Sequence, residues 1–492
     1  MTSDSSSPHD SLGLPRPLRA GLAVLAGAAS GLAWAWYEPR GPVTAVQAVA
    51  LMTSGLAVGM LGGRLTRSRW AALAMPAAHI LAFEVARQGT GLPSAGPVVL
   101  DSAFGVVAFL LGRVVPWALA GVPMALGAAW GRRRMPGRAP WALAAATTAT
   151  ALLAGWLLLP PTAAPVGRDV APGGGFAELE EVTLGGHSQW IQVRGTDPGN
   201  PVLLYLSGGP GQSDLAFSRV LLEPLLADVT IVGWDQRGTG KSYPSLDAAG
   251  LSLDRAVDDV VELARHLRDR FDGRPIHLLG ESWGSLLGVL AVQRAPELFA
   301  SYIGSGQMVD VLETDRRIYA DLVAAAGTAG DGALVAELAQ LSPPPYPSVF
   351  DYGRIMTLYP VLEGTYTPPR EYRERAAAGG VGPLGVLGQE YGPIEKLNVV
   401  RGLLDMFSVM YPQLQGVDLR REAPRLEVPV FILCGDHELA ARTDPARAWF
   451  DRLEAPAKRW YQLPDAGHSV AFEQAGELRR ILREDVPGAA TR

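Results

Sequence analysis

The stretch Gly280-Glu281-Ser282-Trp283-Gly284 decides the fold through the segments on either side of it. Residues 275–279 form a short apolar run that predicts a buried strand, and residues 285–296 have the apolar spacing of a helix. A Gly-x-Ser-x-Gly turn between a strand and a helix is sharp, because its glycines let the backbone pass closely while the serine hydroxyl is pushed into the open. The stretch therefore predicts Ser282 as a nucleophile on an α/β scaffold.

A nucleophilic serine needs a base and an acid that orients this base. Residues 428–435 form a second buried strand, which is followed at once by Asp436-His437-Glu438, and a later strand at 460–463 leads into Gly467-His468-Ser469. The order serine, acid, histidine is that of α/β-hydrolases. We expect His468 to act as general base and then general acid, and a carboxylate after Gly435 to hold its imidazole.

A glycine-rich segment, Ser207-Gly208-Gly209-Pro210-Gly211, follows the apolar strand 202–206. Such a segment can be a tight turn and nothing more. Together with the serine and histidine, it predicts an oxyanion hole formed by the backbone amides of Gly209 and Trp283.

Three ordered motifs carry a resemblance to a known family: the glycine-rich segment 207–211, the run Trp234-Asp235-Gln236-Arg237-Gly238-Thr239-Gly240-Lys241-Ser242, and the serine turn. They resemble the proline iminopeptidase branch of the α/β-hydrolases over about residues 178 to 485. The resemblance implies serine hydrolysis, a helical cap after the sixth core strand, and cap carboxylates that bind the free amine of the substrate's first residue.

The chain departs from that family at two positions. Ser207 stands where relatives carry histidine, and Glu438 stands where they carry the aspartate of the triad. We favour Glu438 over its neighbour Asp436 because it lies three residues after the strand-ending glycine, the family's spacing. Among the acids of the expected cap, Glu390 is our candidate for substrate binding, and a solvated surface residue is the alternative.

The first third of the chain has a different composition. Between residues 20 and 160 there is no lysine, and the only acids are Glu38, Glu84 and Asp101. The apolar runs fall at residues 20–37, 43–62, 70–85, 114–130 and 141–159. Each approaches the roughly 20 residues that cross a bilayer, which predicts five spans in a lipid bilayer rather than a buried soluble bundle.

Arginines give the expected orientation. Clusters precede the first, third and last runs, and cytoplasmic loops retain positive charge. This favours an odd number of spans, with the hydrolase outside the cytoplasm. The alternative concerns residues 98–111, which could be a re-entrant or interfacial helix, or a sixth span. Six spans would place the hydrolase in the cytoplasm.

The expected organisation is a membrane region at 1–160, a Pro/Gly-rich linker at 161–177, an α/β-hydrolase core at 178–308 and 428–492, and a cap at 309–427. The core should be a mainly parallel sheet with helices on both faces. We expect no metal and no cofactor, because one cysteine cannot form a thiolate site and His437-Glu438 lacks a second histidine on the helix.

The expected substrate is a small peptide with a proline or small first residue, or alternatively an ester or lipid-like amide. An alternative outside the enzymes is a membrane protein whose hydrolase-like domain only senses or binds a ligand. The complete set of serine, acid and histidine argues against this alternative. The net charge of −6, without a basic stripe, argues against a nucleic-acid partner.

Overall fold

The computed structural model describes residues 14–133, 140–161 and 175–487. The chain divides into two compact units, one made of Met1–Gly91 with Leu110–Leu159 and the other of Leu92–Phe109 with Pro160–Arg492. Most of the expected linker, residues 162–174, lies outside the described residues.

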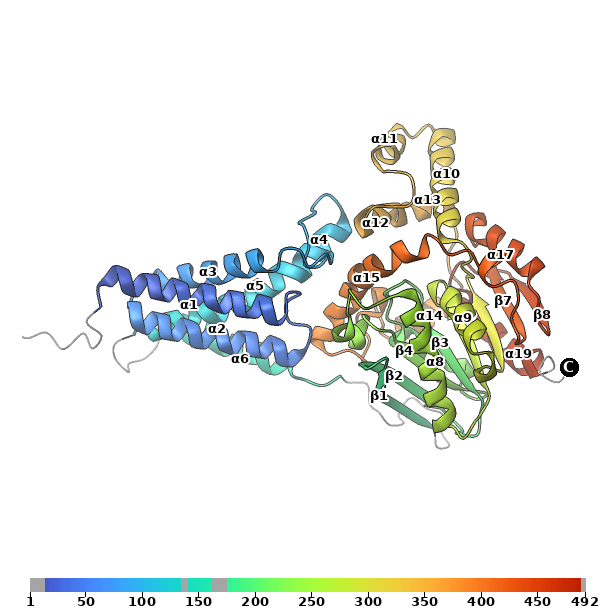
Figure 1. The fold of residues 1–492 in the computed structure, drawn as a ribbon, viewed down its shortest axis with the longest axis horizontal. Helices are drawn as coiled ribbons and strands as arrows, with labels where there is room; N and C mark the ends of the chain where they lie inside the picture. Colours follow the sequence, from blue (N-terminus) through green and yellow to red (C-terminus); the bar gives the residue numbers. More distant parts are fainter. Residues whose placement is uncertain (1–13, 134–139, 162–174, 488–492) are drawn as a thin grey trace, which may run out of the picture. The chain divides into compact units, whose positions relative to one another are not determined.

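The first unit is helical (Figure 1). Its helices are α1 (Arg16–Tyr37), α2 (Ala45–Thr66), α3 (Ala71–Ala86), α5 (Val115–Gly131) and α6 (Trp141–Leu157). Three helices are long and apolar enough to cross a membrane, namely Arg16–Tyr37, Ala45–Thr66 and the continuous Ala103–Gly131, and α3 and α6 are shorter apolar helices. The five predicted apolar runs thus coincide with helices.

Small residues bring the helices of this unit into backbone contact. A Cβ added to Gly59 of α2 would lie 1.9 Å from the carbonyl oxygen of Met124 on α5, and one on Gly31 of α1 would lie 2.1 Å from that of His79 on α3. Stripes of small residues that admit such close approach are typical of helix packing in lipid, where van der Waals contact replaces the hydrophobic effect as the driving force.

The second unit is built on an eight-stranded sheet with the order β1-β2-β4-β3-β5-β6-β7-β8. The strands are β1 (Phe176–Leu184), β2 (His187–Gly195), β3 (Val202–Leu206), β4 (Thr230–Asp235), β5 (Ile276–Glu281), β6 (Ser301–Ser305), β7 (Val430–Gly435) and β8 (Lys458–Leu463). β2 is antiparallel to β1 and β4, and the remaining neighbours are parallel. The predicted α/β-hydrolase sheet is confirmed.

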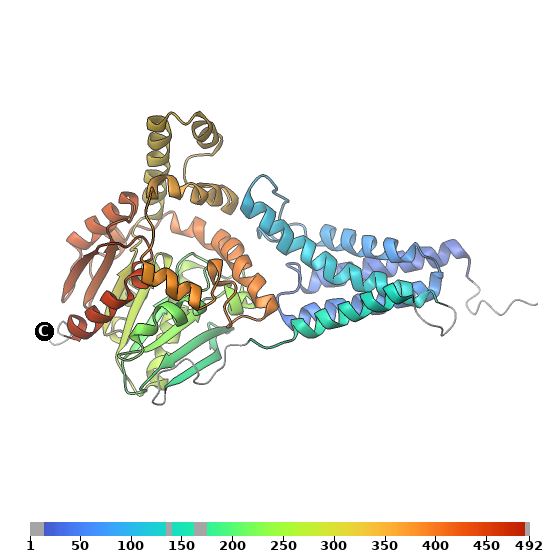
Figure 2. The same cartoon turned by 180° about the vertical axis from the view of Figure 1, so that it is seen from behind.

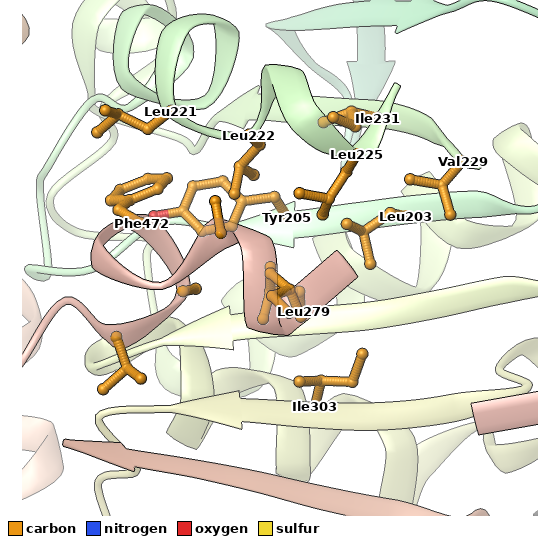
Figure 3. Packing of buried hydrophobic residues seen from close by; sticks show 14 of the residues in the cluster. Leu203, Tyr205, Leu221, Leu222, Leu225, Val229, Ile231, Leu279, Ile303 and Phe472 are labelled. Atoms are coloured by element: carbon orange, nitrogen blue, oxygen red, sulfur yellow. The ribbon is translucent and has the colours of Figure 1, made fainter. Parts of the chain in front are cut away.

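Helices cover both faces of this sheet, with α8 and α9 on one face and α19 on the other (Figures 1 and 2). The helices beside the core strands are α7 (Leu215–Leu221), α8 (Leu253–Arg270), α9 (Trp283–Arg294), α17 (Ala440–Arg452), α18 (Val470–Glu473) and α19 (Ala475–Glu484), and short 3-10 helices lie at Glu223–Leu225, Gly240–Ser245, Pro296–Leu298 and Pro383–Gly385. Alternate strand residues such as Leu203, Leu279 and Ile303 meet Leu222 and Phe472 in one buried cluster (Figure 3).

The cap lies between β6 and β7. Its helices are α10 (Val311–Ala329), α11 (Gly332–Gln340), α12 (Val349–Thr357), α13 (Tyr359–Glu363), α14 (Arg370–Ala378), α15 (Pro393–Leu414) and α16 (Leu419–Glu422). An aromatic cluster joins α12 to α15, with the ring centroids of Tyr352 and Phe407 4.6 Å apart. A long insertion with its own packing is typical of an active-site lid.

Residues 92–109, which we call the strap, come from between the apolar helices but pack within the second unit. The backbone amide of Ser94 donates to Asp405 of α15 at 2.9 Å, and Arg354 of α12 pairs with Asp101 at 2.7 Å. The strap ends in helix α4 (Ala103–Phe109), which a π-helical turn at Leu110–Val114 joins to α5. The segment 98–111, considered above as a re-entrant or interfacial helix or a sixth span, thus contains α4, which belongs to the continuous apolar helix Ala103–Gly131.

Candidate active site

Ser282 occupies the turn between β5 and α9 in a strained backbone conformation, with φ 52° and ψ −117°. Residues with side chains rarely adopt positive φ, and such strain collects at functional sites. The turn is tight enough that a Cβ on Gly280 would lie 2.3 Å from the carbonyl oxygen of Gly284. This is the geometry that presents a serine hydroxyl at the end of a parallel sheet.

Glu438 is the carboxylate that meets His468, and their contact joins Oε2 to Nδ1 of the imidazole. The side chain of Glu438 is 3% exposed. Burial raises the pKa of Glu438, but the charges of His468 and Arg442 outweigh it and lower this pKa to about 2. Asp436, the other acid considered for this role, is exposed. Of the two, the structure brings Glu438 to the histidine.

The end of β6 lies beside both Ser282 and His468. The backbone amide of Ser282 donates to the carbonyl of Ser305 at 3.0 Å. The next residue, Gly306, lies against His468, where a Cβ would come within 2.8 Å of the imidazole Cε1. The ends of β5 and β6 and the loop after β8 thus converge, as expected for the carboxyl ends of parallel strands.

Of the two residues expected to form the oxyanion hole, Trp283 directly follows Ser282 in the chain. Trp283 is the first residue of α9, where backbone N–H groups have no partner inside the helix. The glycine-rich loop reaches the serine from the other side, since a Cβ on Gly208, the neighbour of Gly209, would lie 3.4 Å from the Cβ of Ser282.

Gln236 joins these two parts of the site, a role that sequence reasoning missed. Its side-chain carbonyl accepts from the indole of Trp283 at 3.0 Å, and its amide nitrogen donates to Oγ of Ser207 at 3.2 Å. The next residue, Arg237, forms a buried ion pair with Asp259 at 2.8 Å. The motif at 234–242, noted above only as a resemblance, therefore braces the serine turn against the glycine-rich loop.

Three further carboxyl groups lie around the serine and histidine. Glu281 precedes the serine, is 4% exposed and has an Oε2 without a hydrogen-bond partner among the described residues. Burial, reinforced by the charge of Asp214, raises its pKa well above the usual value. Glu473 accepts from the hydroxyl of the cap residue Tyr366 at 2.8 Å, and burial raises its pKa as well. Sequence reasoning did not single out these acids.

Glu390, the cap acid expected to bind substrate, is fully buried. Its Oε1 contacts Arg219 of α7 and accepts from the Gln192 amide at 3.2 Å. The structure thus pairs this carboxylate with a guanidinium of the core. Among the residues described, no group of three or more His, Cys, Asp or Glu side chains could hold a metal ion.

Comparisons with known proteins agree with this architecture. Residues 201–349 match the family model of the α/β-hydrolase fold. A probable aminopeptidase, YbaC of Bacillus subtilis, is 25% identical over 308 residues, which span 62% of this chain and 95% of the relative. A proline iminopeptidase of Heyndrickxia coagulans is 34% identical over 107 residues, 22% of this chain and 35% of that protein.

Among solved structures, the proline iminopeptidase of Mycobacterium smegmatis aligns with 64% of this chain and 99% of its own at 20% identity and a TM-score of 0.45. The sheet topology and the family match define a chain of the α/β-hydrolase fold. The match to the family model and the similarity to the two sequence relatives support a hydrolase of this superfamily.

Proposed function

We propose that this protein is a membrane-anchored serine hydrolase that acts through an acyl-enzyme, with the activity of an aminopeptidase. The observation that carries the proposal is the contact between His468 and Glu438, beside the strained turn of Ser282. In the proposed reaction Ser282 attacks the substrate carbonyl while His468 takes its proton, and Glu438 stabilises the imidazolium that forms.

The oxyanion of the tetrahedral intermediate would accept hydrogen bonds from the amides of Gly209 and Trp283. His468 would then donate its proton to the leaving amine, which leaves the acyl group on Ser282. Water, activated by the same histidine, releases the acid and restores the serine.

The preference for a free amine rests on the carboxyl groups beside the site. Among the described residues, neither Glu281, Asp214 nor Glu473 forms an ion pair with a lysine or arginine, and burial raises the pKa of all three. An ammonium group that enters such a site favours the charged form of these acids and is itself attracted. We propose Glu281 and Glu473, rather than Glu390, as the acids that favour a substrate with a free amino terminus.

A hydrolysis screen of the purified full-length protein tests the function. Proline and alanine aminoacyl amides are compared with their N-acylated forms and with short-chain esters. Turnover that demands the free amine would support the aminopeptidase. Turnover of esters without regard to the amine would make the protein an esterase with the same catalytic groups.

The membrane anchorage is supported by the apolar helices of the first unit and by their contacts through small residues. Arg64 lies in the last turn of α2, Arg67 and Arg69 lie between α2 and α3, and Arg132 and Arg133 follow α5. If these loops are cytoplasmic, five spans place the hydrolase on the opposite side. Reporter fusions after Leu159 test the sidedness, and strong cytoplasmic reporter activity would reject the five-span arrangement.

A further inference from the structure

The carboxylate of Glu438 has two oxygens with different partners. Oε2 contacts Nδ1 of His468. Oε1 accepts two hydrogen bonds, one from the backbone amide of Leu439 at 2.9 Å and one from Nη1 of Arg442 at 3.0 Å. A glutamate side chain has one more rotatable bond than an aspartate, so its free carboxylate has more orientations to lose when it must orient a histidine.

Arg442 lies on the first turn of α17, and its side chain is 11% exposed. Its guanidinium carbon lies 5.1 Å from the centroid of the Tyr359 ring, and Tyr359 is the first residue of the cap helix α13. The arginine is therefore enclosed between the core, which supplies Glu438, and the cap, which supplies the aromatic face. Cation–π contacts of this kind are stronger where water is excluded.

A second arginine on the same helix, Arg447, also contacts one carboxylate and one aromatic ring, but at an exposed position. Nε of Arg447 pairs with Asp451 at 2.9 Å, and its guanidinium lies 5.3 Å from the ring of Trp460. The Arg447 and Asp451 side chains are 52% and 54% exposed. Exposed pairs at this spacing contribute little, so Arg447 is a matched control for Arg442.

We propose that Arg442 is a positioning residue for the triad acid: it holds Oε1 of Glu438 so that Oε2 faces His468, and Tyr359 of the cap holds the arginine in place. The inference rests on the proposed function, since it assigns Arg442 a role through Glu438 in that reaction. It also makes the orientation of the triad acid dependent on a cap residue, which joins closure of the cap to the reactivity of the serine.

The charge of Arg442 predicts a pH dependence of the activity that a merely structural role would not produce. The positive charge of Arg442 favours the ionised form of Glu438 and opposes uptake of a proton by the pair that Glu438 forms with His468. Without this charge the pair takes up a proton more readily. The acidic limb of the pH profile, where kcat/KM falls as the pH is lowered, therefore moves to higher pH.

The experiment compares Arg442→Met, Arg442→Lys and Arg447→Met with the wild-type full-length protein. For Arg442→Met we expect kcat to fall by roughly tenfold or more, KM to change little, and the acidic limb to rise by about one pH unit. Arg442→Lys keeps the charge but not the forked donors, so it should keep the wild-type limb and lose part of kcat. Arg447→Met should match the wild type in both.

A double-mutant cycle shows whether Arg442 acts through Glu438. In a Glu438→Gln background, Arg442→Met should have almost no further effect on kcat. The double variant also lacks both buried charges, so it remains testable if Arg442→Met alone fails to fold. Equal losses in both backgrounds would overturn the inference.

Ser282→Ala, measured in the same assay, separates the two proposals. Full activity in Ser282→Ala would reject the proposed function and the inference with it. An inactive Ser282→Ala beside an Arg442→Met variant with wild-type kcat and pH profile would reject the inference alone.

Discussion

The core and the cap of the second unit contribute to the same candidate site by different means. Ser282 and His468 follow β5 and β8, where the hydrogen bonds of the sheet fix the backbone. The cap contributes side-chain groups instead. Tyr366 donates to Glu473 and stacks on His437 with ring centroids 4.5 Å apart, and Tyr359 lies under Arg442. Variants of the catalytic residues of the core should therefore abolish chemistry, whereas variants of the cap and of its contacts should lower the rate only in part, or change substrate preference or stability.

The largest expected effect is that of Ser282→Ala in the core. Removing the nucleophile should lower kcat by about 10⁴-fold or more and abolish covalent labelling by a fluorophosphonate probe. The unfolding temperature should stay close to that of the wild type. Labelling that persists at another residue would contradict the assignment of the serine.

The two acids after β7 provide the next test of the core. Glu438→Gln should lower kcat by roughly 10³- to 10⁴-fold, since the amide cannot stabilise the imidazolium. Asp436→Asn, at an exposed position one residue after Gly435, is the matched control and should change kcat less than about threefold. The reverse ranking would move the acid to Asp436.

Glu473→Gln tests whether Glu473, a core carboxylate that the cap residue Tyr366 contacts, binds the amine of the substrate. The amide can still accept from Tyr366, but it cannot attract an ammonium group. We expect KM for free aminoacyl amides to rise on the order of tenfold, while esters and N-acylated substrates are unaffected. Glu477→Gln, at a partly exposed position on α19, is the control. An equal effect on all substrates would argue against binding of the amine.

The strap tests how the cap is held. The Asp405 carboxylate accepts from the Ser94 amide and hydroxyl and from the Tyr243 hydroxyl, and all three residues are buried. Asp405→Ala removes the acceptor of these three buried hydrogen bonds and should destabilise the second unit by about 3 kcal/mol or more. Ser94→Ala retains the amide contact and should cost about 1 kcal/mol. Thermal unfolding in detergent would measure both, and equal losses would contradict the role of the carboxylate.

The smallest expected effect is a pH-dependent change in stability caused by the cap residue Asp315. Burial raises the pKa of Asp315 to about 7, although the Tyr411 hydroxyl donates to it at 2.7 Å. In the unfolded chain the pKa of this carboxyl returns to its ordinary value of 3.8, so ionisation favours unfolding increasingly between pH 3.8 and pH 7. Asp315→Asn removes this penalty and should raise the unfolding temperature by a few degrees at pH 7 and by less at pH 4. A difference that does not vary with pH would contradict this account.

Several features followed from the sequence because they depend on local chemistry. The serine turn needs only small residues between a strand and a helix, and the apolar helices need only length and composition. The resemblance to the iminopeptidase family, through its spacing of the acid after the strand-ending glycine, favoured Glu438 over Asp436, and Glu438 is the acid that the structure brings to His468. These patterns lie within short segments, where the backbone conformation of neighbouring residues sets the geometry.

Only the tertiary structure decided which side chains from distant parts of the sequence contact one another in buried sites. Ser94 and Asp405 are 311 residues apart, and the sequence offered residues 98–111 only as a possible membrane segment. The sequence singled out Glu390 among the acids of the cap for substrate binding, and the path of the chain brings its carboxylate to Arg219 of the core. The contact of Arg442 with Tyr359 joins helices of core and cap. Such contacts depend on how whole elements pack, because burial determines whether a charged side chain is solvated or needs a partner.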